Sequence, residues 1–236
     1  MIRLLLFDVF GTLVDWRTGV AREARAVLEP LGIATDWLGL ADAWRDRYQP
    51  AMQEVRMGRI AYTKLDALHR RNLDVVLTKL GLERVAEEAR EELTLAWHRL
   101  DAWPDVPPAL SRLRERFFLA PCSNANISLM VDLARRNGLA WDAIAGAELA
   151  RDYKPKPAVY LTACAAFDCR PDEALMVAAH SSDLAAAAAA GLRTAFIARP
   201  RERPNAETGP SGPVDFTASD LGALADELLA REPAAC

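Results

Sequence analysis

The first residues of the chain change abruptly from an apolar run to a polar turn. Residues 4–7 are Leu-Leu-Leu-Phe, a run of the length expected for a strand buried inside a parallel sheet. Asp8 follows this run directly, and Gly11 and Thr12 provide a turn. Ligands of open α/β sheets bind beyond the carboxyl ends of the strands, so the pattern places the Asp8 carboxylate at a ligand-binding edge.

A long block with helical periodicity follows this strand. Thr18 can cap a helix that ends at Gly32. Three further helical patterns cover residues 40–58, 63–80 and 83–100. No convincing strand pattern interrupts the block, which predicts an all-helical cap domain inserted over residues 18–100.

Strands and helices alternate again from residue 101 onwards. Apolar strand patterns cover residues 117–122, 174–178 and 194–197. Helical patterns lie between them, and a final one covers residues 221–230 with Ser219 as its cap. The alternation predicts an α/β fold, with a doubly wound, Rossmann-like parallel-sheet core built from residues 1–17 and 101–236. The polar stretch from Arg199 to Pro213 is expected to be a surface loop.

Composition and charge narrow the functional classes. An apolar content of 51% over 236 residues fits a globular chain. A net charge of −4 gives no basic bias, so we expect neither nucleic acid nor a membrane surface as a partner. No apolar segment approaches the roughly 18 residues of a membrane span. Arg3 and Asp8 interrupt the apolar start that a signal peptide requires.

The cysteines have neither the spacing of metal ligands nor the density of a disulfide scaffold. They are Cys122, Cys164, Cys169 and Cys236. We expect them to be reduced and the protein to be cytoplasmic.

Polar groups follow three of the predicted strands. Asp8 follows the first, Ser123-Asn124 the second, and His180 with Asp183 the third. These positions converge on one crevice in a parallel sheet, although they lie far apart in the chain. Lys154, in the sequence Asp-Tyr-Lys-Pro-Lys-Pro, is a further candidate.

This order of motifs resembles the haloacid dehalogenase superfamily, whose nucleophile motif is similar to Phe-Asp-Val-Phe-Gly-Thr-Leu-Val-Asp at residues 7–15. Most of that superfamily transfers phosphoryl groups. Its phosphatases carry a second Asp, a proton donor, where this chain has Phe10, and a metal-binding Asp where it has Ala179. Because Mg²⁺ needs several oxygen ligands, metal-dependent phosphoryl transfer is disfavoured and we expect no metal or other cofactor.

These differences from the phosphatases are similar to those found in the 2-haloacid dehalogenase (type II) branch, which has an aromatic residue at the position of Phe10. Trp44-Arg45 resembles the halide-binding pair of that branch, and Tyr160 its active-site tyrosine. The resemblance implies that Asp8 displaces halide from a short 2-haloalkanoic acid or haloacetate, fluoroacetate included as a candidate. Water then hydrolyses the aspartyl ester and releases a 2-hydroxy acid.

The same resemblance implies roles for the substrate-binding residues. Backbone N–H groups at Val9-Phe10 and near Ser123-Asn124 would hold the substrate carboxylate. Arg45 and Asn124 would receive the halide. A haloacid is then the expected small-molecule partner, and a homodimer is expected from the resemblance alone.

Around the nucleophile, Thr12 would orient Asp8, and Asp183 would pair with Lys154. Asp183 could also position or activate the hydrolytic water. His180 stands where better-known members have Asn, and two roles stay open for it: a water-activating base with an ordinary pKa of about 6.5, or a hydrogen bond to a neighbouring loop.

Two other functions remain compatible with the sequence. A Mg²⁺-dependent phosphatase is supported by Asp8, Lys154 and Asp183 and opposed by Phe10 and Ala179. The other is a non-catalytic homologue that keeps the fold and binds a small anion.

Overall fold

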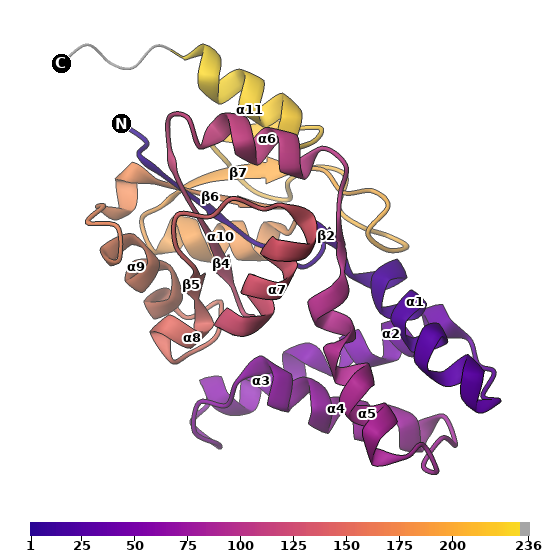
Figure 1. Ribbon diagram of the computed structural model, residues 1–236. Helices are drawn as coiled ribbons and strands as arrows, with labels where there is room; N and C mark the ends of the chain where they lie inside the picture. Colours follow the sequence, from indigo (N-terminus) through magenta and orange to yellow (C-terminus); the bar gives the residue numbers. More distant parts are fainter. Residues whose placement is uncertain (232–236) are drawn as a thin grey trace.

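A six-stranded sheet forms the centre of the computed structural model, which describes residues 1–231 (Figure 1). All neighbouring strands in it are parallel. In spatial order they are β5 (Ala145–Gly146), β4 (Phe118–Ser123), β1 (Leu4–Phe7), β6 (Ala174–Ala178), β7 (Arg193–Ile197) and β8 (Phe216–Ala218). The predicted doubly wound core is confirmed, although β5 and β8 were too short to be recognised from the sequence.

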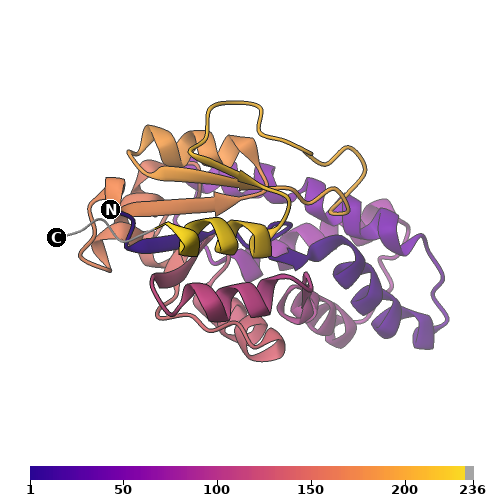
Figure 2. The same cartoon turned by 90° about the horizontal axis from the view of Figure 1, so that it is seen from above.

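Strand β1 is buried on both faces, which explains its unbroken apolar run. Side chains alternate between the faces of a strand. Leu5 and Phe7 therefore join the core cluster that holds residues of α6, α7 and α11, whereas Leu4 and Leu6 join the cluster with α9 and α10. Figure 2 shows helices on both sides of the sheet. Their bounds are α6 (Val106–Leu113), α7 (Ile127–Asn137), α9 (Pro157–Ala165), α10 (Ser181–Ala189) and α11 (Leu221–Ala230), with the short α8 (Ala147–Ala150) and η3 (Pro171–Glu173) in connections.

The direction of winding reverses at β1. The chain proceeds from β1 to β4 and β5 on one side, and then returns to β6, β7 and β8 on the other. A reversal of this kind leaves a crevice beyond the carboxyl end of the central strand. Asp8, the first residue after β1, stands at that crevice.

A block of helices lies to one side of the sheet (Figure 1). Its elements are α1 (Trp16–Leu28), η1 (Glu29–Leu31), α2 (Trp37–Asp46), α3 (Tyr48–Arg56), α4 (Leu65–Lys79), α5 (Glu87–Thr94) and η2 (Leu95–Arg99). The chain enters this block through β2 (Val14–Asp15) and leaves it through β3 (Asp101–Ala102), and the two short strands pair antiparallel. The exact domain boundaries, 18 and 100, stay a prediction.

Several element ends differ from the prediction. Helix α1 begins at Trp16 because Asp15, not Thr18, is its cap: the Asp15 carboxylate accepts from the Thr18 N–H at 3.1 Å. In the same way Asp220 replaces Ser219 as the cap of α11. The patterns at 40–58 and 83–100 each divide into two elements. The sequence shows which residues near the start of a helix carry a side-chain oxygen that could cap it. Which of these oxygens reaches a free backbone N–H group depends on the backbone geometry.

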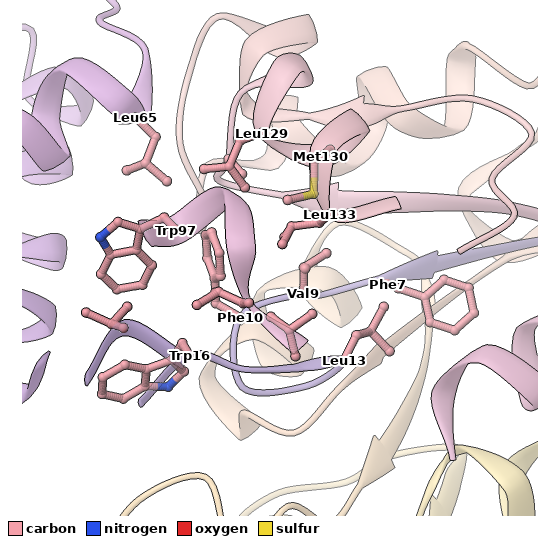
Figure 3. Packing of buried hydrophobic residues seen from close by; sticks show 14 of the residues in the cluster. Phe7, Val9, Phe10, Leu13, Trp16, Leu65, Trp97, Leu129, Met130 and Leu133 are labelled. Carbon is pink, nitrogen blue, oxygen red and sulfur yellow. The ribbon is translucent and has the colours of Figure 1, made fainter. Parts of the chain in front are cut away.

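Aromatic side chains fill the junction between the helical block and the loop that follows Asp8 (Figure 3). The ring centres of Phe10 and Trp97 lie 5.4 Å apart, and those of Trp16 and Trp97 lie 6.3 Å apart. All three residues are buried. Burial of one such ring contributes about 2–3 kcal/mol, so this cluster stabilises the contact between α1, η2 and the turn after Asp8.

Two further expectations concern the environment of the protein. In the described residues no helix has the combination of length and apolarity that a membrane span needs. Cys122, Cys164 and Cys169 are buried free thiols, and Cys236 lies outside the described residues.

Candidate active site

A cavity of about 520 Å³ lies at the carboxyl end of β1. Loops that follow β1, β4, β6 and β7 form one wall, and α2 and α3 contribute another. The lining residues are Asp8, Phe10, Arg45, Asp46, Tyr48, Gln49, Asn124, Lys154, Pro155, His180, Ser182, Asp183, Glu202, Arg203 and Glu207. Convergence of strand ends therefore brings together most of the residues selected from the sequence.

Lys154 connects the two buried carboxylates of the site. Its Nζ lies 2.8 Å from Oδ1 of Asp8 and 2.6 Å from Oδ2 of Asp183. Burial alone would raise the pKa of Asp8, but the Lys154 charge and the hydrogen bond from His180 outweigh it and hold that pKa well below its usual range. Asp8 is therefore ionised at neutral pH. The pairing of Asp183 with Lys154 is the one predicted.

Thr12 fixes the orientation of the Asp8 carboxylate. Its hydroxyl donates to Oδ2 of Asp8 at 2.7 Å and accepts from the Ala179 N–H at 3.0 Å. Thr12 is fully buried, so water does not compete for these hydrogen bonds. The loops after β1 and β6 are thereby joined beside Asp8.

His180 is held between two carboxylates. Its Nδ1 lies 3.1 Å from Oδ2 of Asp8, and its Nε2 lies 3.1 Å from Oε2 of Glu202. Burial alone would lower the pKa of His180, but the hydrogen bonds and charges of Asp8 and Glu202 raise it to about 10. The expectation of an ordinary pKa near 6.5 is wrong, because the residue carries a proton at neutral pH. His180 does hydrogen-bond a neighbouring loop, through Glu202, whereas its part in the reaction stays a prediction.

The stretch from Arg199 to Pro213 is not simply a surface loop. Arg199 is buried, and it donates to the Thr12 carbonyl at 2.8 Å and to both carboxylate oxygens of Asp105. Glu202 is 3% exposed and accepts from Nε1 of Trp16 at 2.8 Å. Glu202 was not predicted as a site residue from the sequence. The only available signal was its position after a strand, β7, whose carboxyl end shares the edge with Asp8.

Arg45 brings a cation to the opposite wall of the cavity. Its guanidinium carbon lies 4.2 Å from the ring centre of Tyr48 and 5.2 Å from that of Trp16. Within residues 1–231, the buried Nη1 atom of Arg45 has no hydrogen-bond partner. A buried N–H of a cation that lacks a partner favours an anion as its ligand. Tyr48 lines the same cavity.

Asn124 supports the site from the end of β4. Its Oδ1 accepts from the backbone N–H of Lys154 at 2.8 Å, and its side chain reaches the cavity. The hydrogen bond places the lysine backbone beside Asn124, so the two sequence-distant motifs are held in one geometry.

Besides Thr12, four selected residues lie behind the cavity rather than on its surface. Trp44 is buried and donates to the His69 carbonyl at 2.9 Å. The Oγ of Ser123 accepts from the Ala125 N–H, and the Tyr160 hydroxyl donates to Oδ1 of Asp183 at 2.5 Å. The Val9 side chain belongs to the apolar core. The cavity lining does not include the side chains of Trp44, Ser123 and Tyr160. These side chains support the residues that line the cavity.

Comparisons with known proteins show which proteins the chain resembles. A family model described as haloacid dehalogenase-like hydrolase matches residues 2–191. (S)-2-haloacid dehalogenase 1 of Pseudomonas sp. (strain CBS-3) is 33% identical over 203 residues, which cover 84% of this chain and 85% of that protein. Haloacetate dehalogenase H-2 of Moraxella sp. (strain B) is 28% identical over 202 residues, covering 84% and 86% respectively.

Solved structures give a similar result. A defluorinating L-2-haloacid dehalogenase is 41% identical with a TM-score of 0.94, and the match covers 97% of this chain and 96% of that chain. Another L-2-haloacid dehalogenase is 43% identical with a TM-score of 0.93, over 98% of this chain and 100% of that chain. The likeness thus extends over both the sheet and the helical block.

Proposed function

The chain belongs to the haloacid dehalogenase-like hydrolase family, and from this premise we propose that it hydrolyses the carbon–halide bond of a short 2-haloalkanoic acid or haloacetate. The observation that carries the proposal is the environment of Asp8. The carboxylate is kept ionised by Lys154 and oriented by Thr12, while the apolar Phe10 lines the cavity nearby. A leaving group that departs as a stable anion needs no proton donor, and a halide is such a group.

In the first step, an Asp8 oxygen attacks the α-carbon of the substrate. The carbon–oxygen bond forms as the carbon–halide bond breaks, and the halide leaves with the bonding electron pair. Holding the two reacting atoms in line can supply about 7–11 kcal/mol of the barrier. The product of this step is an aspartyl ester.

The charge of the pocket suits an anionic substrate. Attack by one carboxylate on a molecule that carries another is repulsive unless cations compensate. Arg45 and Lys154 both line the cavity, and the unpartnered Nη1 of Arg45 supports a role in receiving the halide together with Asn124. Backbone N–H groups at Val9-Phe10 and at the start of α7 are our candidates for holding the substrate carboxylate.

In the second step, water attacks Cγ of the Asp8 ester and the 2-hydroxy acid leaves. We assign activation of that water to Asp183, because His180 already carries a proton in the free enzyme. Burial raises the pKa of Asp183, which makes its carboxylate a stronger base, although Lys154 opposes this shift. The step restores the Asp8 carboxylate.

A single-turnover experiment in heavy-oxygen water tests the proposal. With bromoacetate and excess enzyme, the isotope should enter the Asp8 side chain first, and Asp8→Asn should release no bromide. Direct entry of the isotope into glycolate, with Asp8 unlabelled, would contradict the ester mechanism.

A substrate panel tests the reaction class. It should contain fluoro-, chloro- and bromoacetate and both enantiomers of 2-chloropropionate, in EDTA and in Mg²⁺. Fluoroacetate belongs in it because one of the similar structures is that of a defluorinating enzyme. Halide release in EDTA supports dehalogenation. Hydrolysis of p-nitrophenyl phosphate in Mg²⁺ but not in EDTA would instead indicate a phosphatase. A homodimer and a cytoplasmic location remain predictions.

A further inference from the structure

We propose that Glu202 is a positioning residue that keeps His180 as an imidazolium ion, and that this ion donates a hydrogen bond to the carbonyl oxygen of the Asp8 ester while the ester is hydrolysed. The inference rests on the proposed function, because it concerns the second half of that reaction. It assigns a role to a loop residue that no sequence motif selected.

The two oxygens of Asp8 have different surroundings. Oδ2 accepts from the Thr12 hydroxyl at 2.7 Å and faces Nδ1 of His180 at 3.1 Å. Oδ1 accepts from Lys154 alone, at 2.8 Å, among the side-chain contacts in the described residues. Oδ1 therefore keeps the freer lone pair for attack on carbon. Oδ2 then becomes the ester carbonyl oxygen and already faces two donors.

Glu202 completes the hydrogen bonding of His180 from the other side. Nε2 lies 3.2 Å from Oε1 and 3.1 Å from Oε2 of Glu202. Because each ring nitrogen faces a carboxylate oxygen, both are donors, and the ring carries a full positive charge. The raised pKa of His180 agrees with this geometry.

Glu202 is itself held rigidly beside the turn that follows the nucleophile. Its Oε1 accepts from Nε1 of Trp16, and its side chain is buried. A Cβ built on Gly11 would lie 2.1 Å from Oε1, so the glycine is what admits the carboxylate to this position. The turn sequence and the distant loop are therefore complementary in shape.

Formation of the ester changes the balance of charge around His180. Alkylation removes the negative charge of Asp8, and Glu202 becomes the remaining carboxylate in hydrogen-bond contact with the ring. The other charged groups that line the cavity from neighbouring elements are Arg45, Asp46, Lys154, Asp183, Arg203 and Glu207. A retained Glu202 charge thus keeps the imidazolium protonated at the stage where it is needed.

Hydrolysis of the ester passes through a tetrahedral intermediate at Cγ of Asp8. The water oxygen bonds to Cγ, its proton passes to Asp183, and the carbonyl electron pair moves to Oδ2. The resulting oxyanion accepts from Thr12 and His180. When the intermediate collapses, the Cγ–Oδ1 bond breaks, Asp183 returns the proton to the departing Oδ1, and the new acid group on Asp8 loses its proton to solvent.

Glu202→Gln separates the two half-reactions. With bromoacetate in rapid-quench experiments, bromide release should stay within about fivefold of the parent enzyme, whereas glycolate formation should slow by about 10–100-fold. The Asp8 ester should accumulate and be visible by intact-protein mass. Glu202→Asp, which keeps the charge, should restore much of the hydrolysis rate.

The pH dependence distinguishes a charged donor from a base. If His180 donates as an imidazolium, ester hydrolysis slows as the pH rises through its pKa, and Glu202→Gln moves this fall to lower pH. The chain has three histidines, so His180→Asn identifies the His180 signal by NMR, and Glu202→Gln should lower its measured pKa. Arg201→Gln is the control: Arg201 is an exposed residue of the same loop that does not line the cavity, and the variant should not accumulate ester.

Three results overturn the inference. The first is ester hydrolysis in Glu202→Gln at the parental rate at every pH. The second is a rate that rises with pH through the His180 pKa, as a base would require. The third is a parental enzyme that releases no halide, and this result would contradict the proposed function as well. If the parental enzyme releases halide and Glu202→Gln hydrolyses the ester at the parental rate, only the inference about Glu202 is contradicted.

Discussion

Nδ1 of His98 lies 2.7 Å from Oδ2 of Asp132, and this contact joins the helical block to α7 of the core. Nε2 of the same ring lies 3.2 Å from Oδ1 of Asp66 in the first turn of α4. Burial alone would lower the pKa of His98, but the two carboxylates raise it above its ordinary value. When His98 is protonated, it pairs with both carboxylates and thus holds together two parts of the chain that flank the cavity.

His98→Gln should therefore destabilise the protein in a pH-dependent way. Because the folded-state pKa is raised, the stabilisation is fully present below the unfolded value of about 6.5 and is lost as the pH rises through the folded value. The partner carboxylates are partly exposed, so we expect about 1 kcal/mol or less. The free energy of unfolding, measured by urea denaturation across this range, should differ between parent and variant most at the acidic end. A difference that grows with pH would contradict the assignment.

Lys154→Met should abolish most activity and lower stability. The substitution leaves Asp8 and Asp183 as two buried carboxylates without their shared cation. Removing one partner of a buried ion pair lowers the free energy of unfolding by about 3–5 kcal/mol. We expect kcat/KM for bromoacetate to fall by about 10²-fold or more. Lys156→Met is the matched control, because Lys156 is exposed. Equal losses in the two variants would argue against a role for the Lys154 ammonium group.

Arg45→Met should weaken halide binding. The substitution removes a cation whose Nη1 atom lacks a partner, while keeping an apolar stem against Tyr48. Inhibition of turnover by bromide should become at least about tenfold weaker, since a charged hydrogen bond contributes about 1.5–3 kcal/mol. Arg59→Met, at an exposed site on the same helical block, should leave the bromide inhibition constant unchanged. Unaltered inhibition in Arg45→Met would place the halide elsewhere.

Gly11→Ala should damage the site more than the backbone conformation alone explains. Gly11 has a φ of +87°, and its added Cβ would collide with the Glu202 carboxylate. Gly58→Ala is the matched control for Gly11→Ala, because Gly58 has a φ of +68° and nothing lies within 4 Å of its added Cβ. Each should lose about 1 kcal/mol of stability through the positive φ, but only Gly11→Ala should lose activity. Parallel thermal unfolding and bromoacetate assays decide this; full activity in Gly11→Ala would show that the contact is dispensable.

The amino-acid sequence alone determined much of the candidate active site. The buried run at residues 4–7, the carboxylate after it and the polar groups after β4 and β6 were recognisable because strand burial and strand ends leave local patterns. Parallel pairing then requires those ends to meet. Lys154 was selected by its match to a family motif, and neither strand burial nor a strand end predicted it.

Only the tertiary structure decided which side chains face the cavity and what charge they carry. Glu202 meets Trp16 across 186 residues of chain, and no local pattern encodes such a contact. The protonation of His180 depends on Asp8, 172 residues away, and on a loop that was expected to lie on the surface. A pKa is set by burial and by neighbouring charges, and those are properties of the folded chain and not of the segment in which the residue stands.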